Sequence, residues 1–162
     1  MKYEITNISK RVLGATVYRI RLLKRVNDLP EGTLLGWVEN EHNLSQEGDC
    51  LVCDNGMVMG NAHISKDAIV CDHAIVCNDA VVTDNAKVTG SCLIMDYAHI
   101  SENAKVSYTA WVQDYAIVKG HAHISANGTV SGNVIVSGNK VIVGEYGDNE
   151  YFIDFATKGP AA

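Results

Sequence analysis

The sequence of 162 residues has few aromatic side chains and no long apolar stretch. Phe, Trp and Tyr make up 7% of the residues, so we expect a thin core of Val, Ile and Ala. No apolar run reaches the ~20 residues of a transmembrane helix, and the N-terminus lacks an apolar signal region. The five cysteines follow no disulfide-framework spacing, which is typical of a reducing compartment. These absences predict a cytoplasmic protein that does not enter a membrane.

Acidic and basic residues are unevenly distributed along the chain, whose formal net charge is −6. Residues 1–25 hold seven Lys or Arg and one acidic residue, which gives +6. Residues 26–162 hold six Lys or Arg and eighteen acidic residues, which gives −12. Because the larger part is acidic and no recognised motif is present, the composition argues against a nucleic-acid binder. The basic segment is expected to lie on the acidic remainder, to be solvated, or to act as an interaction arm.

A period of six residues runs without insertion from Asp49 to Gly144 and forms sixteen consecutive units. The fourth residue of every unit is Val or Ile, and the second is Ala, Cys or Gly in fourteen units. The first and sixth residues are mostly Asn, Asp or Gly. A strict short period of this kind is the signature of a β-solenoid. A β-roll or sandwich is the alternative, but those folds do not keep a perfect six-residue register.

Elementary geometry explains the residue types within one unit. Val and Ile favour extended backbone, and because side chains alternate along a strand, the second and fourth residues share one side. Ala62 and Ile64 therefore point inward, whereas His63 and Ser65 point outward. Asn, Asp and Gly tolerate the left-handed backbone that a corner needs. Three units make a triangular coil, so the sixteen units make about five coils stacked about 4.8 Å apart.

The segments on either side of the repeat are expected to cover its ends. Residues 1–48 are predicted to form a β-hairpin and cap, because residues 2–6 and 16–22 alternate like strands around a turn near Gly14. Three apolar residues are expected to close the N-terminal end of the prism: Leu34, Leu35 and Trp37.

The last segment, residues 145–162, is predicted to form a final strand and a loose tail. Its strand would contain the alternating residues Tyr151, Ile153 and Phe155. The chain is thus expected to divide into a hairpin and cap (1–48), a β-helix (49–144) and a C-terminal strand with its tail (145–162).

A second pattern leads directly into the repeat. A YRIRLL strand begins at Tyr18, the turn Trp37-Val38-Glu39 follows, and Asn43-Leu44-Ser45 precedes the first unit. With the repeat, this segment resembles a group of YdcK-like phage and prophage hexapeptide-repeat proteins, over roughly residues 16–144. The resemblance implies a left-handed parallel β-helix and a phage or mobile-element setting, and it implies no activity.

Outward residues of every third unit share one face of the predicted prism. One face carries an apolar stripe, which we define as Met57, Met59, Ile75, Cys77, Leu93, Met95 and Trp111. An exposed apolar surface of this size is unusual on a soluble monomer. It is therefore expected to be covered by the N-terminal hairpin, by another subunit of a dimer or trimer, or by a foreign partner. Tyr97 and Tyr115 occupy the same corner in adjacent coils, where they either shield the corner or form a stacking ledge.

The cysteines do not predict a metal or redox site, and no cofactor is expected. Cys50 and Cys53 have CxxC spacing, but Cys50 points inward and Cys53 outward, so they cannot share one metal ion. Cys53 and Cys71 share a face in adjacent coils and lie within reach of a disulfide. Two reduced thiols packed side by side are the interpretation that we favour.

Four histidines are the candidate catalytic residues of an enzyme: His63, His99, His121 and His123. Hexapeptide acyltransferases use a histidine as general base in a cleft between trimer subunits, but they usually carry an inserted loop, and this repeat has none. Zinc chemistry like that of β-helix carbonic anhydrases is not expected, because His63 and His99 lie two coils apart, roughly 9–10 Å.

The sequence therefore predicts a non-enzymatic scaffold or binding protein that presents flat β-helix faces to a protein partner or to itself. The phage-like resemblance adds the hypothesis that the protein inhibits a host defence system. Acyl transfer at a trimer interface is the alternative function.

Overall fold

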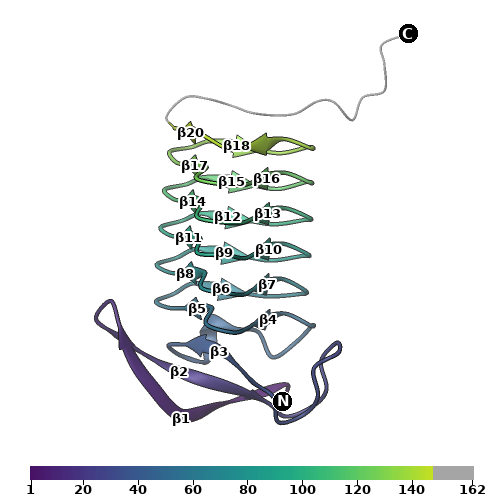
Figure 1. Ribbon diagram of the computed structural model, residues 1–162. Helices are drawn as coiled ribbons and strands as arrows, with labels where there is room; N and C mark the ends of the chain where they lie inside the picture. The colour runs from purple at the N-terminus through teal and green to yellow at the C-terminus, as the bar shows by residue number, and fades with distance from the viewer. Residues whose placement is uncertain (148–162) are drawn as a thin grey trace.

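The computed structural model describes residues 1–147, which form an all-β parallel β-helix with a hairpin across its N-terminal end (Figure 1). The parallel β-helix predicted from the repeat is confirmed. It has about six turns, because the stacking begins before the first six-residue unit. The strand expected at Tyr151, Ile153 and Phe155 lies outside the described residues.

Three sheets form the sides of the prism, and the strands stacked along each side are parallel. The nine-stranded sheet joins the hairpin strands to seven stacked strands: β3 (Leu34–Val38), β5 (Met57–Val58), β8 (Ile75–Val76), β11 (Leu93–Ile94), β14 (Trp111–Val112), β17 (Thr129–Val130) and β20 (Glu145–Tyr146). The six-stranded sheet contains β4 (Leu51–Val52), β7 (Ile69–Val70), β10 (Lys87–Val88), β13 (Lys105–Val106), β16 (His123–Ile124) and β19 (Val141–Ile142). The five-stranded sheet contains β6 (His63–Ile64), β9 (Val81–Val82), β12 (His99–Ile100), β15 (Ile117–Val118) and β18 (Ile135–Val136).

Backbone hydrogen bonds join each coil to the residue eighteen positions further on. His63, for example, is in register with Val81, which is in register with His99. The Val or Ile at the fourth position of each unit is fully buried. The last coil is two residues shorter, because Glu145 of β20 pairs with Thr129.

Each corner is formed by a residue in the left-handed region. Every sixth residue from Asp54 to Gly138 has a positive φ, between 51° and 73°. Asp, Asn and Gly fill most of these positions because they tolerate this backbone. Four corners carry less suitable residues: Lys66, Glu102, Tyr108 and Ala126. The corner therefore explains why Asn, Asp and Gly punctuate the repeat.

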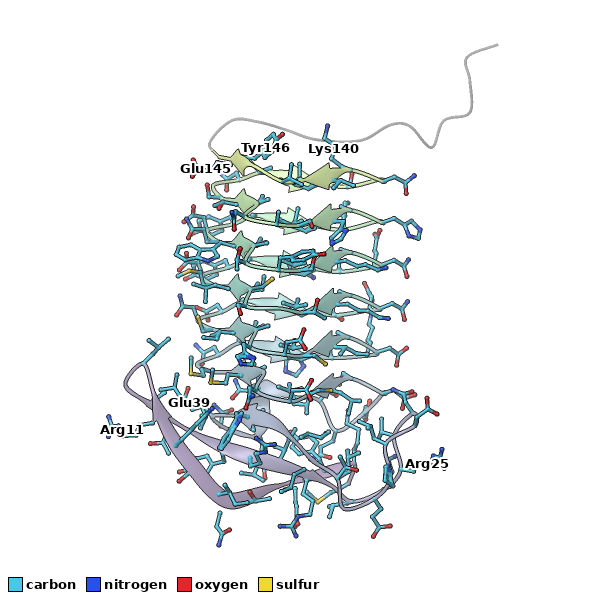
Figure 2. All side chains as sticks on the ribbon, in the orientation of Figure 1. Arg11, Arg25, Glu39, Lys140, Glu145 and Tyr146 are labelled. Atoms are coloured by element: carbon cyan, nitrogen blue, oxygen red, sulfur yellow. The ribbon has the colours of Figure 1, made fainter. Side chains whose placement is uncertain are left out.

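The hairpin closes the N-terminal end of the prism. Strands β1 (Tyr3–Val12) and β2 (Ala15–Leu22) meet at Leu13 and Gly14, both with positive φ, which matches a two-residue hairpin turn. Strand β2 pairs antiparallel with β3, and β3 pairs parallel with β5, so the hairpin continues the nine-stranded sheet. Figure 1 shows the hairpin lying across the end of the stack. Arg11 and Arg25 lie at opposite sides of this end (Figure 2).

The cap residues differ from those expected. Leu35 is buried in the prism core, as predicted, but Leu34 is 44% exposed and Trp37 packs on the outside of the prism. Strand alternation explains Leu34, which cannot share a side with Leu35. Trp37 lies on the other side from Leu35 because the pairing of β3 with β2 shifts register between these residues, where Arg19 pairs with Trp37 but Arg21 with Leu34. The core is instead closed by Tyr3, whose hydroxyl donates to the carbonyl of Leu44 at 2.6 Å. Burial raises the pKa of Tyr3 to about 12.

Lys2 is buried beside Tyr3, which the sequence pattern did not indicate. Its Nζ donates to the carbonyl oxygens of Gly48 at 3.2 Å and Cys50 at 2.8 Å. These carbonyls stand at the start of the repeat, where no preceding coil covers them. The Lys2 ammonium group thus satisfies carbonyl oxygens at the exposed edge of the first coil. The same hydrogen bonds offset part of the free-energy cost of burying its charge.

The short segment between β3 and β4 completes the first coil. A 3-10 helix, η1 (Glu41–Asn43), is followed by Leu44, which bridges Ile64 in the five-stranded sheet. Asn43 is buried, and its Nδ2 donates to the carbonyls of Gly60 and Ala62 at 3.0 and 2.9 Å. The Asn-Leu-Ser segment therefore takes the place of a six-residue unit.

Exchanging residues at corners tests the role of the left-handed backbone. Ala126→Gly should raise the free energy of unfolding by about 0.5–1 kcal/mol, because relief of left-handed strain exceeds the entropy cost of glycine. Gly120→Ala should lower it by more than ~1 kcal/mol, because φ is 67° and the new Cβ would lie 2.8 Å from the amide nitrogen of Gly138. Urea unfolding measures both. A loss of stability in Ala126→Gly would contradict this account of the corner.

Candidate functional site

The N-terminal half of the apolar stripe is covered by the hairpin. Val17 of β2, Trp37 of β3 and Met59 form a buried cluster outside the prism core. Five partly buried residues pack against this cluster: Val12, Ala15, Met57, Ile75 and Cys77. Of the three covers considered for the stripe, the chain's own hairpin thus accounts for its first four residues.

The basic N-terminal segment takes part in this packing. Lys10 Nζ lies 4.1 Å from the centroid of the Trp37 ring, and the Arg19 guanidinium carbon lies 5.1 Å from it. Cation–π contacts of this kind stabilise by about 0.5–1 kcal/mol at exposed sites. Part of the excess positive charge of residues 1–25 is therefore used on the chain's own surface.

The other half of the stripe extends beyond the hairpin and joins two tyrosines. Leu93 and Met95 are half-buried, whereas Trp111, in register with Leu93, is 47% exposed. Tyr97 and Tyr115 follow at the corner between the nine- and five-stranded sheets, with ring centroids 5.0 Å apart and planes at 1°. They are 56% and 60% exposed. We call Leu93, Met95, Tyr97, Trp111 and Tyr115 the aromatic patch.

Carboxylates border the aromatic patch. Asp96 and Asp114 occupy the corner directly before Tyr97 and Tyr115. One oxygen of Asp96 accepts from the amide of Asp114 at 3.2 Å, and one oxygen of Asp114 accepts from the amide of Gly132 at 2.8 Å. These bonds hold the carboxylates beside the rings, so the patch has an acidic rim.

The structure does not bring the four candidate histidines together. His63 and His99 lie in the five-stranded sheet with β9 between them, and His121 is exposed at a corner. His63 contacts the carbonyl of His42 through Nδ1 at 2.5 Å. His123, in the six-stranded sheet, lines a groove.

The groove lies along the six-stranded sheet and has a volume of about 460 Å³. Six of the lining residues have a polar group at the end of the side chain: Lys87, Thr89, Lys105, Ser107, Tyr108 and His123. Asp72 also lines it, and one oxygen of this carboxylate accepts from the amide of Gly90 at 2.8 Å. The eighteen-residue offset in the sequence predicts which residues point outward from this sheet, but it does not predict the groove.

Ser107 and His123 form a close pair within the groove. Ser107 Oγ lies 2.7 Å from His123 Nε2. Burial, and then the positive charge of Lys105, lower the pKa of His123, so its ring is neutral at pH 7. The tautomer of the neutral ring sets whether the Ser107 hydroxyl donates to Nε2 or accepts from it. Among the described residues no carboxylate bonds the other ring nitrogen, so the pair lacks the third group that orients the base in a catalytic triad.

All five cysteines are free thiols. Cys53 and Cys71 are hydrogen-bonded to each other, which lowers the pKa of the Cys53 thiol and raises that of Cys71. Cys50 faces the core, as its position in the repeat predicts. Within residues 1–147 no group of three His, Cys, Asp or Glu side chains is arranged to hold a metal ion.

The chain matches no protein-family model, and no curated protein resembles it significantly in sequence. In the part of the chain that the structure describes, no helix has the length and apolar character to cross a membrane.

The pKa of His123 is expected to respond to its neighbour in the groove. Lys105→Gln should raise it toward the ordinary value of 6.5 but not beyond, because burial, the larger cause, remains. Since the folded state binds this proton less readily than the unfolded state, His123 contributes stability above pH 6.5 that is lost as the pH falls further. Imidazole proton resonances followed against pH measure the shift. Lys119→Gln, on another sheet, should leave it unchanged, and a wild-type midpoint above 6.5 would contradict the assignment.

Proposed function

We propose that the protein is a non-enzymatic binding protein whose aromatic patch docks another protein. The observation that carries this proposal is the exposure of Trp111 on the nine-stranded sheet and of the stacked Tyr97 and Tyr115 at the corner where this sheet ends. Trp and Tyr are the residues that most often dominate the energetics of protein interfaces. They lie on strands and corners held by hydrogen bonds to the coils on either side, so little conformational entropy is lost on binding.

The acidic rim favours a foreign partner over a second copy. Two patches pressed together would place Asp96 and Asp114 of both copies in one interface, between chains that each carry a net charge of −6. A partner with an apolar surface bordered by Lys or Arg would neutralise these carboxylates and gain in association rate. We therefore infer a partner with basic residues around an apolar centre.

Acyl transfer remains a second candidate because of the Ser107–His123 contact. His123 would act as the general base toward a substrate hydroxyl. Its Nε2 is already hydrogen-bonded to Ser107, so the substrate would have to displace that hydroxyl. Turnover of acetyl-CoA that is lost in His123→Ala would support this candidate over the binding protein.

Trp111→Glu should weaken partner binding by at least about tenfold, because a charge replaces a central aromatic contact. The measurement is capture from host lysate, followed by titration of the purified partner against wild type and variant. Val141→Glu is the matched control, since Val141 is equally apolar, 58% exposed and on the six-stranded sheet. Light scattering should show a monomer; a dimer that Trp111→Glu dissociates would contradict the inference of a foreign partner.

The resemblance to phage proteins supports a sharper form of the proposal, in which the partner belongs to a host defence system. Expression of the chain in bacteria that carry defence systems should then raise phage plaque counts, and Trp111→Glu should abolish the increase while Val141→Glu retains it. Equal protection by both variants, or no protection in any host, would count against this form.

A further inference from the structure

We propose that the groove on the six-stranded sheet binds a small phosphorylated molecule, whose phosphate groups lie between Lys87 and Lys105. This site is separate from the aromatic patch, which belongs to the nine-stranded sheet. The inference does not depend on the proposed protein partner.

Register places two lysines and His123 in a row. Lys87 of β10 pairs with Lys105 of β13, which pairs with His123 of β16. All three are outward residues at the third position of their units, so their side chains leave the sheet in the same direction at a spacing of about 4.8 Å. A phosphate or diphosphate group can contact both ammonium groups at this spacing.

No carboxylate in residues 1–147 forms an ion pair with either lysine. Like charges in register on neighbouring strands are destabilising. Lys66 shows the usual solution in this protein, because its Nζ lies 2.6 Å from an oxygen of Asp84 in the next coil. Neither Lys87 nor Lys105 forms such an ion pair among the described residues. Asp72 lines the groove, but it accepts from the amide of Gly90 and pairs with neither lysine. An anion in the groove would remove the repulsion.

Hydroxyl donors complete the site. Thr89 and Ser107 are half-buried in the groove, two residues after Lys87 and Lys105 on the same outward side. Phosphate oxygens accept readily from hydroxyl and ammonium donors. The volume of about 460 Å³ lies within the range of small-molecule sites, which is about 300–1,000 Å³, and exceeds what inorganic phosphate needs. The ligand is therefore an organic phosphate.

Tyr108 supplies a flat wall for the organic part. It lines the groove, is 67% exposed and occupies a corner with φ of 62°. A tyrosine in this left-handed conformation costs about 1–2 kcal/mol, whereas Asp, Asn or Gly occupies most equivalent corners. Strain of this kind often marks a functional position. We infer that a planar group of the ligand packs on the Tyr108 ring.

Calorimetry with ADP as the probe tests the site, with inorganic pyrophosphate as the second probe. ADP should bind to wild type, and Lys87→Gln and Lys105→Gln should each weaken binding by at least about tenfold. Lys119→Gln removes the same charge on the five-stranded sheet and should change the affinity less than about twofold. Both groove lysines are exposed, so the variants should keep the wild-type circular dichroism and unfolding midpoint.

Tyr108→Ser separates the two halves of the proposal, because serine at this corner removes only the ring. It should weaken ADP binding and leave pyrophosphate binding unchanged. Backbone amide chemical shifts recorded with and without ADP locate the bound probe. Three results would overturn the proposal: no binding of either probe at up to about 10 mM, a loss of affinity in Lys119→Gln equal to that in the groove variants, or ADP-induced shift changes that lie outside the groove.

Discussion

The chain must turn through a left-handed residue once in every six, and the rest of the structure depends on this turn. From Asp54 to Gly138 the left-handed residue recurs at every sixth position, so every side has the same length. Equal sides return the chain to the same point after eighteen residues, where its amides meet the carbonyls of the next coil. The register then places each buried Val or Ile directly over its equivalent, which gives a continuous core from small side chains.

A stack of this kind has two open ends, and the N-terminal end shows how one is closed. Without a cap, the first coil would expose its core and a row of unpaired backbone groups. The hairpin pairs with β3 and covers the core with Tyr3 and Leu22, while the Lys2 ammonium binds carbonyls at the edge. The same hairpin buries Val17 against Trp37 and Met59 on the outer face. One element therefore closes the end of the prism and covers the first part of the apolar stripe.

Outward positions need neither the left-handed backbone of the corners nor the small or branched side chains of the core. The faces of the prism therefore differ in their outward residues. On the nine-stranded sheet they collect Leu93, Met95 and Trp111 beside a stacked tyrosine pair with an acidic rim. On the six-stranded sheet they collect two lysines that form no ion pair among the described residues, with two hydroxyls and a histidine in a groove. A rigid prism can thus present an apolar surface and a cationic groove on neighbouring sides, and neither needs a change in the fold.

The six-residue period alone determined the parallel β-helix, the inward Ala and Val or Ile, the three faces and the stacking of Tyr97 on Tyr115, because each follows from strand alternation and an eighteen-residue offset. The same offset placed Lys87, Lys105 and His123 on one face. Tertiary structure alone decided the rest. Residues 1–48 have no repeat, so the burial of Lys2, the outward packing of Trp37 and the reach of the hairpin over Met59 could not be predicted from a pattern. The groove, and the contact between Ser107 and His123, likewise depend on the rotamers of neighbouring side chains, which a period in the backbone does not specify.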